Sequence, residues 1–149
     1  MTVPAADDYV AILNLYATYN LCSDEGDAEG YASCFASKGV LELVTAGLTL
    51  SGHDRFVEFK QKDKAGRPHI YRRHWNGSIE LTQQPDGTVK GRCYLLAFNG
   101  TPTQIPAIAD CGVYEDTLVK ENGAWKFLRR HLVMDATTFK APVKSSEAA

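Results

Sequence analysis

The chain has 149 residues, of which 44% are hydrophobic and 23% are charged, and its formal net charge is −2. This size predicts a single domain over residues 1–149 with a hydrophobic core of its own, ordered at about 7–138. The nearly balanced charge argues against a nucleic-acid partner, and the lack of a long apolar run in the sequence argues against a membrane span.

The cysteines and the N-terminal segment favour a cytoplasmic protein. The cysteines form no CxxC pair, and their spacing suits neither a zinc site nor a disulfide framework. Free, buried thiols in a reducing compartment are therefore expected at Cys22, Cys34, Cys93 and Cys111. Residues 1–8 lack the basic start and the apolar stretch of a signal peptide.

Helical patterns dominate the first half of the chain. Apolar residues recur at helical spacing over about residues 7–22, and Asp7 or Asp8 is the expected N-cap. The elements expected after this helix are a short helix at about 28–35, strands at 40–44 and 48–50, and a helix at roughly 55–63.

The second half is rich in strand patterns. Turn signals at Pro85-Asp86-Gly87 and Asn122-Gly123 separate long alternating segments. The strands expected here run over about 70–83, 89–98, 107–120 and 125–134. Helices followed by hairpin-connected strands predict an α+β domain, in which one curved antiparallel sheet holds the three helices in its concave face. The C-terminal residues 141–149 are small and polar and are predicted to be flexible.

This order of elements resembles the nuclear transport factor 2-like superfamily, whose members form a cone-shaped, cystatin-like α+β barrel. Over about residues 8–135 the chain is similar to the SnoaL-like group, which includes scytalone dehydratase, hexachlorocyclohexane dehydrochlorinase and bile-acid dehydratase. The resemblance rests on the final hairpin, from Gly112-Val113-Tyr114-Glu115-Asp116 to Asn122-Gly123-Ala124-Trp125-Lys126-Phe127. This hairpin is typical of the fold and of no single reaction, because the fold hosts many functions.

Asp24 and His74 are the candidate catalytic pair. The spacing from Tyr19 to Asp24 resembles that in the dehydratase members of the group, where the tyrosine and the aspartate line the cone. His74 falls where those enzymes place their catalytic histidine, shortly before a long strand. The resemblance therefore implies a dyad in which Asp24 accepts a hydrogen bond from one ring nitrogen of His74 and the other nitrogen is the base. Tyr19 would polarise a substrate carbonyl.

The chemistry of these residue types fits that role. Imidazole can exchange a proton at physiological pH, and a carboxylate partner fixes its tautomer and stabilises the imidazolium. Positioned acid–base catalysis of this kind contributes roughly 10²–10⁴-fold to a rate. On the pattern alone, Asp24 could instead be a solvated turn residue, His74 a packed strand residue and Tyr19 part of the apolar helix face.

Aromatic side chains are the expected wall of a small apolar pocket. The candidates for contact with a substrate are Tyr31, Phe35, Trp75, Tyr94 and Phe98, each of which could alternatively belong to the core. Asn99 and Tyr114 stand roughly where scytalone dehydratase has a pocket histidine and a pocket asparagine. These two differences argue against scytalone itself as the substrate.

The remaining histidines are not expected in the site. His53 and His69 lie in predicted loop or helix-start segments. His131, followed by Asp135, is placed on the outer face of the last strand, with the mouth of the cone as the alternative. No local spacing brings together the three or four ligands that a metal requires. Nucleotide-binding and nucleophile-elbow motifs are also missing from the sequence, so neither a metal nor a cofactor is expected.

These features predict a cofactor-independent lyase, a scytalone dehydratase-like enzyme that dehydrates a small, hydrophobic, cyclic or aromatic-like substrate. An isomerase or a polyketide cyclase could use the same pocket, and a non-catalytic binding or assembly module could use the same fold. Alternation over residues 94–98 and 112–114 leaves apolar residues on both sides of the sheet. A homo-oligomer, either a dimer or a trimer, is therefore expected.

Overall fold

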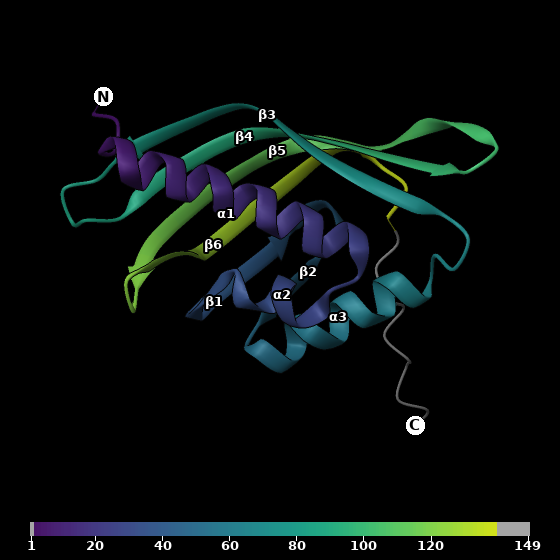
Figure 1. Cartoon of the computed structure of the whole chain (residues 1–149), viewed down its shortest axis with the longest axis horizontal. Helices are drawn as coiled ribbons and strands as arrows, with labels where there is room; N and C mark the ends of the chain where they lie inside the picture. Colours follow the sequence, from purple (N-terminus) through teal and green to yellow (C-terminus); the bar gives the residue numbers. More distant parts are fainter. Residues whose placement is uncertain (1, 140–149) are drawn as a thin grey trace.

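The computed structural model describes residues 2–139, in which three helices pack against the concave side of a curved six-stranded sheet (Figure 1). The helices are α1 (Ala6–Glu25), α2 (Ala28–Ser33) and α3 (His53–Ala65). The strands are β1 (Phe35–Leu43), β2 (Leu48–Ser51), β3 (Tyr71–Gln83), β4 (Val89–Thr101), β5 (Gln104–Glu121) and β6 (Ala124–Thr137), and a 3-10 helix at Val44–Ala46 joins β1 to β2. The α+β class is as predicted, and the segment 141–149 lies outside the described residues. No helix in the described part of the chain has the length and apolarity to cross a bilayer.

The strands lie in the order β2-β1-β6-β5-β4-β3. Strands β3 to β6 form the antiparallel meander that the turn signals predict. The pairing between β1 and β6 is parallel, which corrects the prediction of a wholly antiparallel sheet. Parallel neighbours need a long connection, and here β2, α3 and the meander separate β1 from β6 in the chain.

Helix α1 lies across the concave face of the sheet (Figure 1). Its buried residues recur at helical intervals and extend into the last turn: Ile12, Leu15, Tyr16, Tyr19, Ser23 and Asp24. Gly26 ends the helix in the left-handed conformation (φ 80°), and its N–H donates to the Cys22 carbonyl at 3.0 Å. The helix therefore continues past its predicted end at Cys22, which places Asp24 on the buried face instead of in a solvated turn.

The predicted N-cap of α1 is wrong. The cap position is occupied by Ala5, whose side chain cannot accept a hydrogen bond. Asp7 and Asp8 lie in the first turn, where a carboxylate interacts favourably with the helix dipole. Asp8 accepts hydrogen bonds from Trp125 Nε1 at 2.7 Å and Lys120 Nζ at 3.0 Å, and these bonds lower its pKa. Asp8 therefore attaches the start of the helix to the β5–β6 hairpin instead of capping it.

A buried ion pair lies in the core beneath α1. Asp116 and Arg130 are cross-strand neighbours on β5 and β6, and neither side chain is exposed. Arg130 Nε and Nη2 donate to the two Asp116 oxygens at 3.1 Å each, and Tyr16 Oη donates to Asp116 Oδ2 at 2.6 Å. The guanidinium also lies 3.8 Å from the ring centre of Tyr114 and 4.2 Å from that of Phe127. The core thus contains two charges that must remain paired.

Alternation along β3 decides which predicted site residues can meet. Successive side chains of a strand point to opposite faces of the sheet. Arg72 and His74 line a chamber on the concave side, whereas Arg73 and Trp75 line a groove on the convex side. The concave side, covered by the helices, is therefore the side on which a site around His74 forms.

Candidate active site

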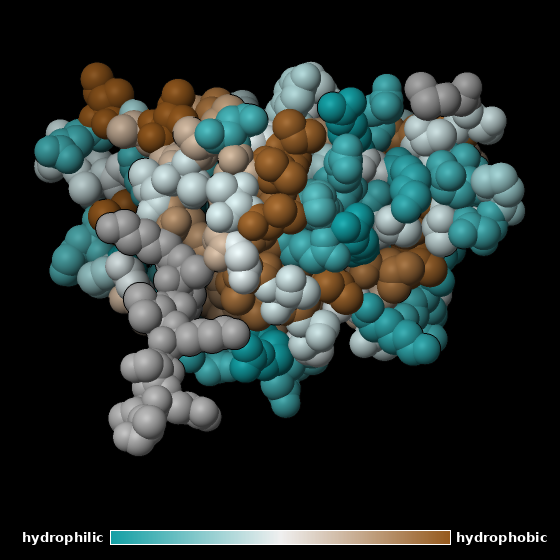
Figure 2. All heavy atoms as spheres, turned by 180° about the vertical axis from the view of Figure 1, so that it is seen from behind, coloured by the Kyte–Doolittle hydropathy of each residue, from teal (hydrophilic) through white to brown (hydrophobic). Residues whose placement is uncertain are grey.

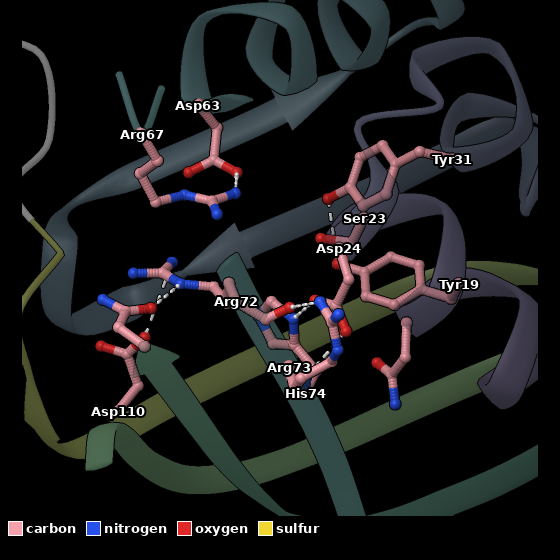
Figure 3. Close-up of polar contacts among 12 residues, drawn as sticks. Tyr19, Ser23, Asp24, Tyr31, Asp63, Arg67, Arg72, Arg73, His74 and Asp110 are labelled. Atoms are coloured by element: carbon pink, nitrogen blue, oxygen red, sulfur yellow. Dashed lines mark hydrogen bonds and ion pairs between the residues drawn. The ribbon is translucent and has the colours of Figure 1, made fainter. Parts of the chain in front are cut away.

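Asp24 and His74 meet at the end of α1 (Figure 3). Nδ1 of His74 lies 2.5 Å from Asp24 Oδ1, and the backbone N–H of His74 donates to Asp24 Oδ2 at 3.0 Å. The carboxylate thus holds both the ring and the backbone of the histidine. Exposed fractions of 6% for the Asp24 side chain and 12% for that of His74 leave the pair largely shielded from water.

The contact with Asp24 defines which ring nitrogen of His74 carries the proton. A carboxylate accepts hydrogen bonds, so we assign the proton of the neutral ring to Nδ1 and the lone pair to Nε2. Within residues 2–139 no group forms a hydrogen bond with Nε2, and His74 lines a small chamber. This is the geometry of a general base whose orientation is fixed by a carboxylate.

The chamber next to the dyad, here called the inner chamber, lies between α1, α3 and the sheet. Its volume is about 60 Å³, enough for a few water molecules or for one end of an organic ligand. Its polar lining includes Tyr19, Ser23, Tyr31, Lys60, His74 and Tyr114. Apolar side chains of β1, β4 and β6 cover much of the remaining wall. The structure thus brings three of the predicted site tyrosines into the same chamber as His74.

Two tyrosine hydroxyls form a donor group in this chamber. The Oη atoms of Tyr19 and Tyr31 lie 2.9 Å apart, so one hydroxyl proton lies between them. The other hydroxyl proton is left for a third acceptor, such as a substrate carbonyl oxygen. Burial raises the pKa of both phenols, so at neutral pH they are hydrogen-bond donors and not bases.

Lys60 on α3 is a second donor in the inner chamber. Its side chain is 5% exposed, and Nζ donates to Ser23 Oγ at 2.7 Å and to Asp63 Oδ2 at 3.1 Å. Burial lowers the pKa of Lys60, and the neighbouring Asp63 carboxylate opposes this effect. The ammonium lies 4.6 Å from the centre of the Tyr31 ring. A cation and a pair of phenols are therefore available to stabilise negative charge on a bound oxygen.

A second cavity, here called the outer chamber, adjoins the first and has a volume of about 350 Å³. The residues that line both chambers are Phe59, Asp63, Arg72 and Phe139. Leu48 and Leu50 of β2 add apolar surface to the outer chamber. Ligand pockets typically measure roughly 300–1,000 Å³, so the inner chamber alone is too small for most organic substrates. A substrate that reaches His74 would have its body in the outer chamber and its reacting end in the inner one.

Charged groups line the border between the chambers (Figure 3). On the helix side, Arg67 Nη2 donates to Asp63 Oδ2 at 2.8 Å. On the sheet side, Arg72 Nε donates to Asn99 Oδ1 at 2.9 Å, and Arg72 Nη1 lies 3.7 Å from Asp110 Oδ2. Asn99, a predicted substrate contact, therefore positions Arg72 at the border.

Replacing Asp63 by asparagine should reduce stability in a pH-dependent way. Burial raises the pKa of Asp63, but Lys60 and Arg67 outweigh this effect and lower it to about 2. Because the folded-state pKa lies below the unfolded value near 4, the stabilisation is present above pH ~4 and is lost as the pH falls toward 2. We expect Asp63→Asn to cost about 2 kcal/mol at pH 7 and almost nothing near pH 2. Urea unfolding at several pH values measures this difference, and the fully exposed Asp54 provides a control variant, Asp54→Asn, with no expected change. An equal loss for Asp63→Asn at all pH values would contradict the assignment.

Four of the predicted wall residues lie away from both chambers. Phe35 is stacked on Phe56 in the core, with ring centres 4.0 Å apart. Trp75 and Tyr94 are 66% and 56% exposed, and Phe98 lines a groove with Trp75 on the convex face. Trp75 directly follows His74 on β3, and adjacent strand residues point to opposite faces. The expectation that these residues enclose the substrate is therefore corrected.

His131 forms a second histidine–carboxylate pair, on the convex face. Its Nδ1 lies 2.6 Å from Glu42 Oε2, and Arg129 donates to both Glu42 oxygens at 3.0 and 2.7 Å. Asp135 is exposed farther along β6, and His53 pairs with Glu29 at 2.9 Å on the surface. These histidines therefore lie outside the chambers. Among residues 2–139, no cluster of three or more His, Cys, Asp or Glu side chains is arranged to hold a metal ion.

The site residues that sequence analysis missed lie on one helical face and one strand face. The helical face runs from Phe56 through Phe59 and Lys60 to Asp63, and Arg67 follows four residues later, after the helix has ended at Ala65. Arg72 lies two residues before His74 and hence on the same side of β3. Both spacings are visible in the sequence, but charged residues on a short helix are usually solvated, so they did not indicate a site.

The fold, with a chamber beside the Asp24–His74 pair, is that of a small-molecule-processing domain. The SnoaL-like domain family model matches residues 4–131, and the chain belongs to this family. Members of the family are therefore the relevant comparison for ligand binding and chemistry. A comparison with curated proteins found no match.

Solved structures support the fold. Aln2 from a Streptomyces species is 21% identical with a TM-score of 0.81, covering 90% of this chain and 95% of that chain. A Novosphingobium aromaticivorans protein provisionally named a scytalone dehydratase is 23% identical with a TM-score of 0.74, covering 91% and 89%. A Nostoc punctiforme protein of unknown function with a cystatin-like fold is 24% identical with a TM-score of 0.71, covering 90% and 96%. At these identities the similarity establishes the cystatin-like α+β architecture and not the reaction.

Proposed function

We propose that the protein is a cofactor-independent dehydratase that removes water from a small cyclic β-hydroxycarbonyl compound. The observation that carries this proposal is the Asp24–His74 hydrogen bond of 2.5 Å at the wall of the inner chamber. An unused ring nitrogen inside such a chamber is suited to removing a proton from carbon next to a carbonyl group. The provisional name of the Novosphingobium structure is consistent with a reaction of this class.

In the proposed reaction, His74 Nε2 takes the proton from the carbon α to the carbonyl. The electrons of the C–H bond move toward the carbonyl oxygen, and the enolate accepts hydrogen bonds from the Tyr19–Tyr31 pair and from Lys60. The carbonyl then re-forms, a C=C bond forms, and the bond to the β-hydroxyl breaks. The leaving hydroxide takes the proton from the His74 imidazolium, so the products are the enone and water. Asp24 stabilises the imidazolium throughout.

An isomerase or a cyclase is the second candidate function. The low exposure of His74 supports it, because a proton held on a shielded imidazole can return to a different carbon of the same substrate. The first half of the reaction is then identical, and no group leaves. A purely structural module receives less support, since the dyad is within hydrogen-bond distance and faces a cavity.

Product mass distinguishes the two enzymatic functions. We would incubate the protein with the cyclic β-hydroxyketones 3-hydroxycyclohexanone and 3-hydroxy-5-oxocyclohexanecarboxylate, and with the unsaturated 3-cyclohexenone. Loss of one water and formation of a conjugated enone supports the dehydratase, whereas migration of the double bond at constant mass supports the isomerase. Wild-type rates no higher than those of His74→Gln on every compound would contradict both.

We further propose that the convex face of the sheet forms the interface of a homo-oligomer. Trp75, Tyr94, Ile108 and Val133 are between 43% and 66% exposed on this face. A groove of about 380 Å³ beside them is lined by Tyr71, Arg73, Trp75, Leu96, Phe98 and Pro106. Figure 2 shows apolar side chains gathered in the middle of this face and toward the β4–β5 hairpin. Exposed apolar patches of this kind are typical of association surfaces.

Replacing Trp75 by glutamate should dissociate the oligomer. Light scattering coupled to size exclusion is expected to give a dimer or a trimer for the wild type and a monomer for Trp75→Glu at micromolar concentration. Val10, which is 65% exposed on α1, provides the matched control, since Val10→Glu adds the same charge to another surface. A monomeric wild type at this concentration would refute the interface.

The predicted cytoplasmic location remains a proposal. All four cysteines are free in the structure, and Cys111 is exposed. A protein that keeps one thiol exposed and the others free fits a reducing compartment, where disulfides do not form. Cys34 and Cys93 are buried as the sequence predicted, and burial raises the pKa of both thiols to about 12. Cys22 is only half-buried and Cys111 is exposed, so the expectation of burial is wrong for these two.

A further inference from the structure

The outer chamber contains a guanidinium whose hydrogen-bonding capacity is only partly used. Arg67 follows α3, its side chain is 10% exposed, and its Nη2 donates to Asp63. Its Nε and Nη1 atoms are buried and have no hydrogen-bond partner among residues 2–139. Three N–H bonds of one cation therefore lack an acceptor. Buried N–H groups in folded proteins are almost always paired. Both atoms are closed off from the solvent-accessible space of the chamber that Arg67 lines, so an acceptor bound there reaches them when the guanidinium turns toward it.

The charges around the outer chamber favour an anion as that acceptor. Four cationic side chains line it, Arg55, Lys62, Arg67 and Arg72, against two carboxylates, Glu58 and Asp63. Glu58 pairs with Lys62 at 2.8 Å, and Asp63 is shared between Lys60 and Arg67. Arg72 pairs with Asp110 at 3.7 Å, so the positive charge left without a carboxylate of its own includes that of Arg67, which shares Asp63 with Lys60.

The position of Arg67 relative to the dyad indicates which molecule the anionic group belongs to. The outer chamber shares Phe59, Asp63, Arg72 and Phe139 with the inner chamber, which His74 lines. A ligand held at Arg67 can therefore extend past Phe59 toward the dyad. Leu48, Leu50 and the two phenylalanines offer apolar surface to the body of such a ligand.

We propose that Arg67 binds a carboxylate of the substrate, so that the substrate class is a cyclic carboxylic acid whose reacting carbonyl end enters the inner chamber. The position of the reacting carbonyl rests on the proposed function, and the presence of a carboxylate on the substrate rests on the geometry of Arg67. The carboxylate takes no part in the reaction, so its hydrogen bond to Arg67 is equally strong in the ground state and in the transition state. Arg67 is therefore a substrate-binding residue that sets specificity and KM, and His74 sets kcat.

Ligand binding tests this proposal without any need for turnover. We would measure the Kd of 2-naphthoate and of the neutral, isosteric 2-naphthamide by calorimetry for wild type, Arg67→Met, Arg67→Lys and Arg129→Met. The wild type is expected to prefer the carboxylate by roughly 10- to 100-fold, the range of a charge-assisted hydrogen bond. Arg67→Met should lose the preference and leave naphthamide affinity unchanged, while Arg67→Lys should keep part of it. Arg129 pairs with Glu42 on the convex face and lines neither chamber, so Arg129→Met should keep the preference.

The outcomes separate this inference from the proposed function. Naphthoate binding by His74→Gln at wild-type affinity, together with loss of turnover, is expected if both proposals hold. Failure of every hydroxyketone to react would leave the naphthoate preference intact and would count against the dehydratase only. Equal wild-type affinity for the two naphthalenes, absence of naphthoate binding, or a preference that survives in a folded Arg67→Met variant would overturn the carboxylate site. Melting temperatures measured in parallel identify a variant that fails to fold, and Arg67→Lys then serves as the test.

Discussion

Replacing His74 by glutamine is expected to lower kcat by about 10²–10⁴-fold on a substrate of the protein, because it removes the only chamber base held by a carboxylate in the described residues. The amide N–H group of glutamine can still donate a hydrogen bond to Asp24, so the melting temperature should change little. Asp24→Asn should lower kcat to a similar degree, since an amide does not stabilise an imidazolium as a carboxylate does. Initial rates and thermal unfolding of the same preparations measure both effects.

The convex face provides a matched control for this prediction. His131 has the same hydrogen bond to a carboxylate, at 2.6 Å from Glu42, but it lies outside both chambers. His131→Gln therefore removes a histidine–carboxylate pair without touching the proposed base, and its kcat should equal that of the wild type. A large loss of activity in His131→Gln, or none in His74→Gln, would show that the dyad is not the catalytic unit.

The second large effect is on stability. Arg130→Met should destabilise the fold by about 3–5 kcal/mol, because it leaves the fully buried Asp116 carboxylate without its charge partner. This loss is a large fraction of the roughly 5–15 kcal/mol by which a typical domain is stable. Urea unfolding at pH 7 measures the loss in unfolding free energy. A variant near the limit of stability will already be partly unfolded without denaturant.

Two further variants make the stability prediction specific. Arg129, next to Arg130 in sequence, pairs with Glu42 on the convex face and is 45% exposed, so Arg129→Met should cost no more than about 1 kcal/mol. The double variant Asp116→Leu/Arg130→Met removes both charges and should be more stable than Arg130→Met alone. If the double variant is the less stable one, the core does not depend on pairing of these charges.

Much of the fold and the central pair of the site could be predicted from the sequence. Turn residues such as Asp86-Gly87 and Asn122-Gly123 mark the hairpins of the meander, and helical spacing marks α1 and α3. The meeting of Asp24 with His74 was predictable only through the family resemblance, since no local pattern joins residues so far apart in the chain. The structure adds the local reason, which is the continuation of α1 as far as Gly26.

The errors in the predicted pocket wall have a common physical cause. In Tyr94–Phe98, apolar residues occupy both faces of β4, so hydrophobicity alone does not indicate which face is the concave one. Burial in the structure identifies the concave face of β4, since Cys93, Leu95 and Ala97 are buried while Tyr94 is half exposed. The parallel β1–β6 pair was equally hidden, because strand patterns specify alternation and not partners.

The charged border residues were missed for a different reason. Lys60 and Arg67 are long cationic side chains, which lie at the surface in most proteins. Here the same face of α3 that buries Phe56 also carries Lys60 inward, and Arg67, two residues after the end of the helix, lines the outer chamber. Tertiary packing, and not composition, turns them into site residues.

The central claim is that His74, oriented by Asp24, removes a proton from carbon inside the inner chamber. The most direct measurement is the rate at which α-protons of 3-hydroxycyclohexanone and of 3-oxocyclohexanecarboxylate exchange for deuterium in D₂O, followed by proton NMR at neutral pD. We predict saturable exchange catalysed by the wild type and by His131→Gln, and exchange at the uncatalysed rate for His74→Gln and Asp24→Asn. Exchange by His74→Gln at the wild-type rate, or no wild-type exchange above the uncatalysed rate with either ketone, would contradict the claim.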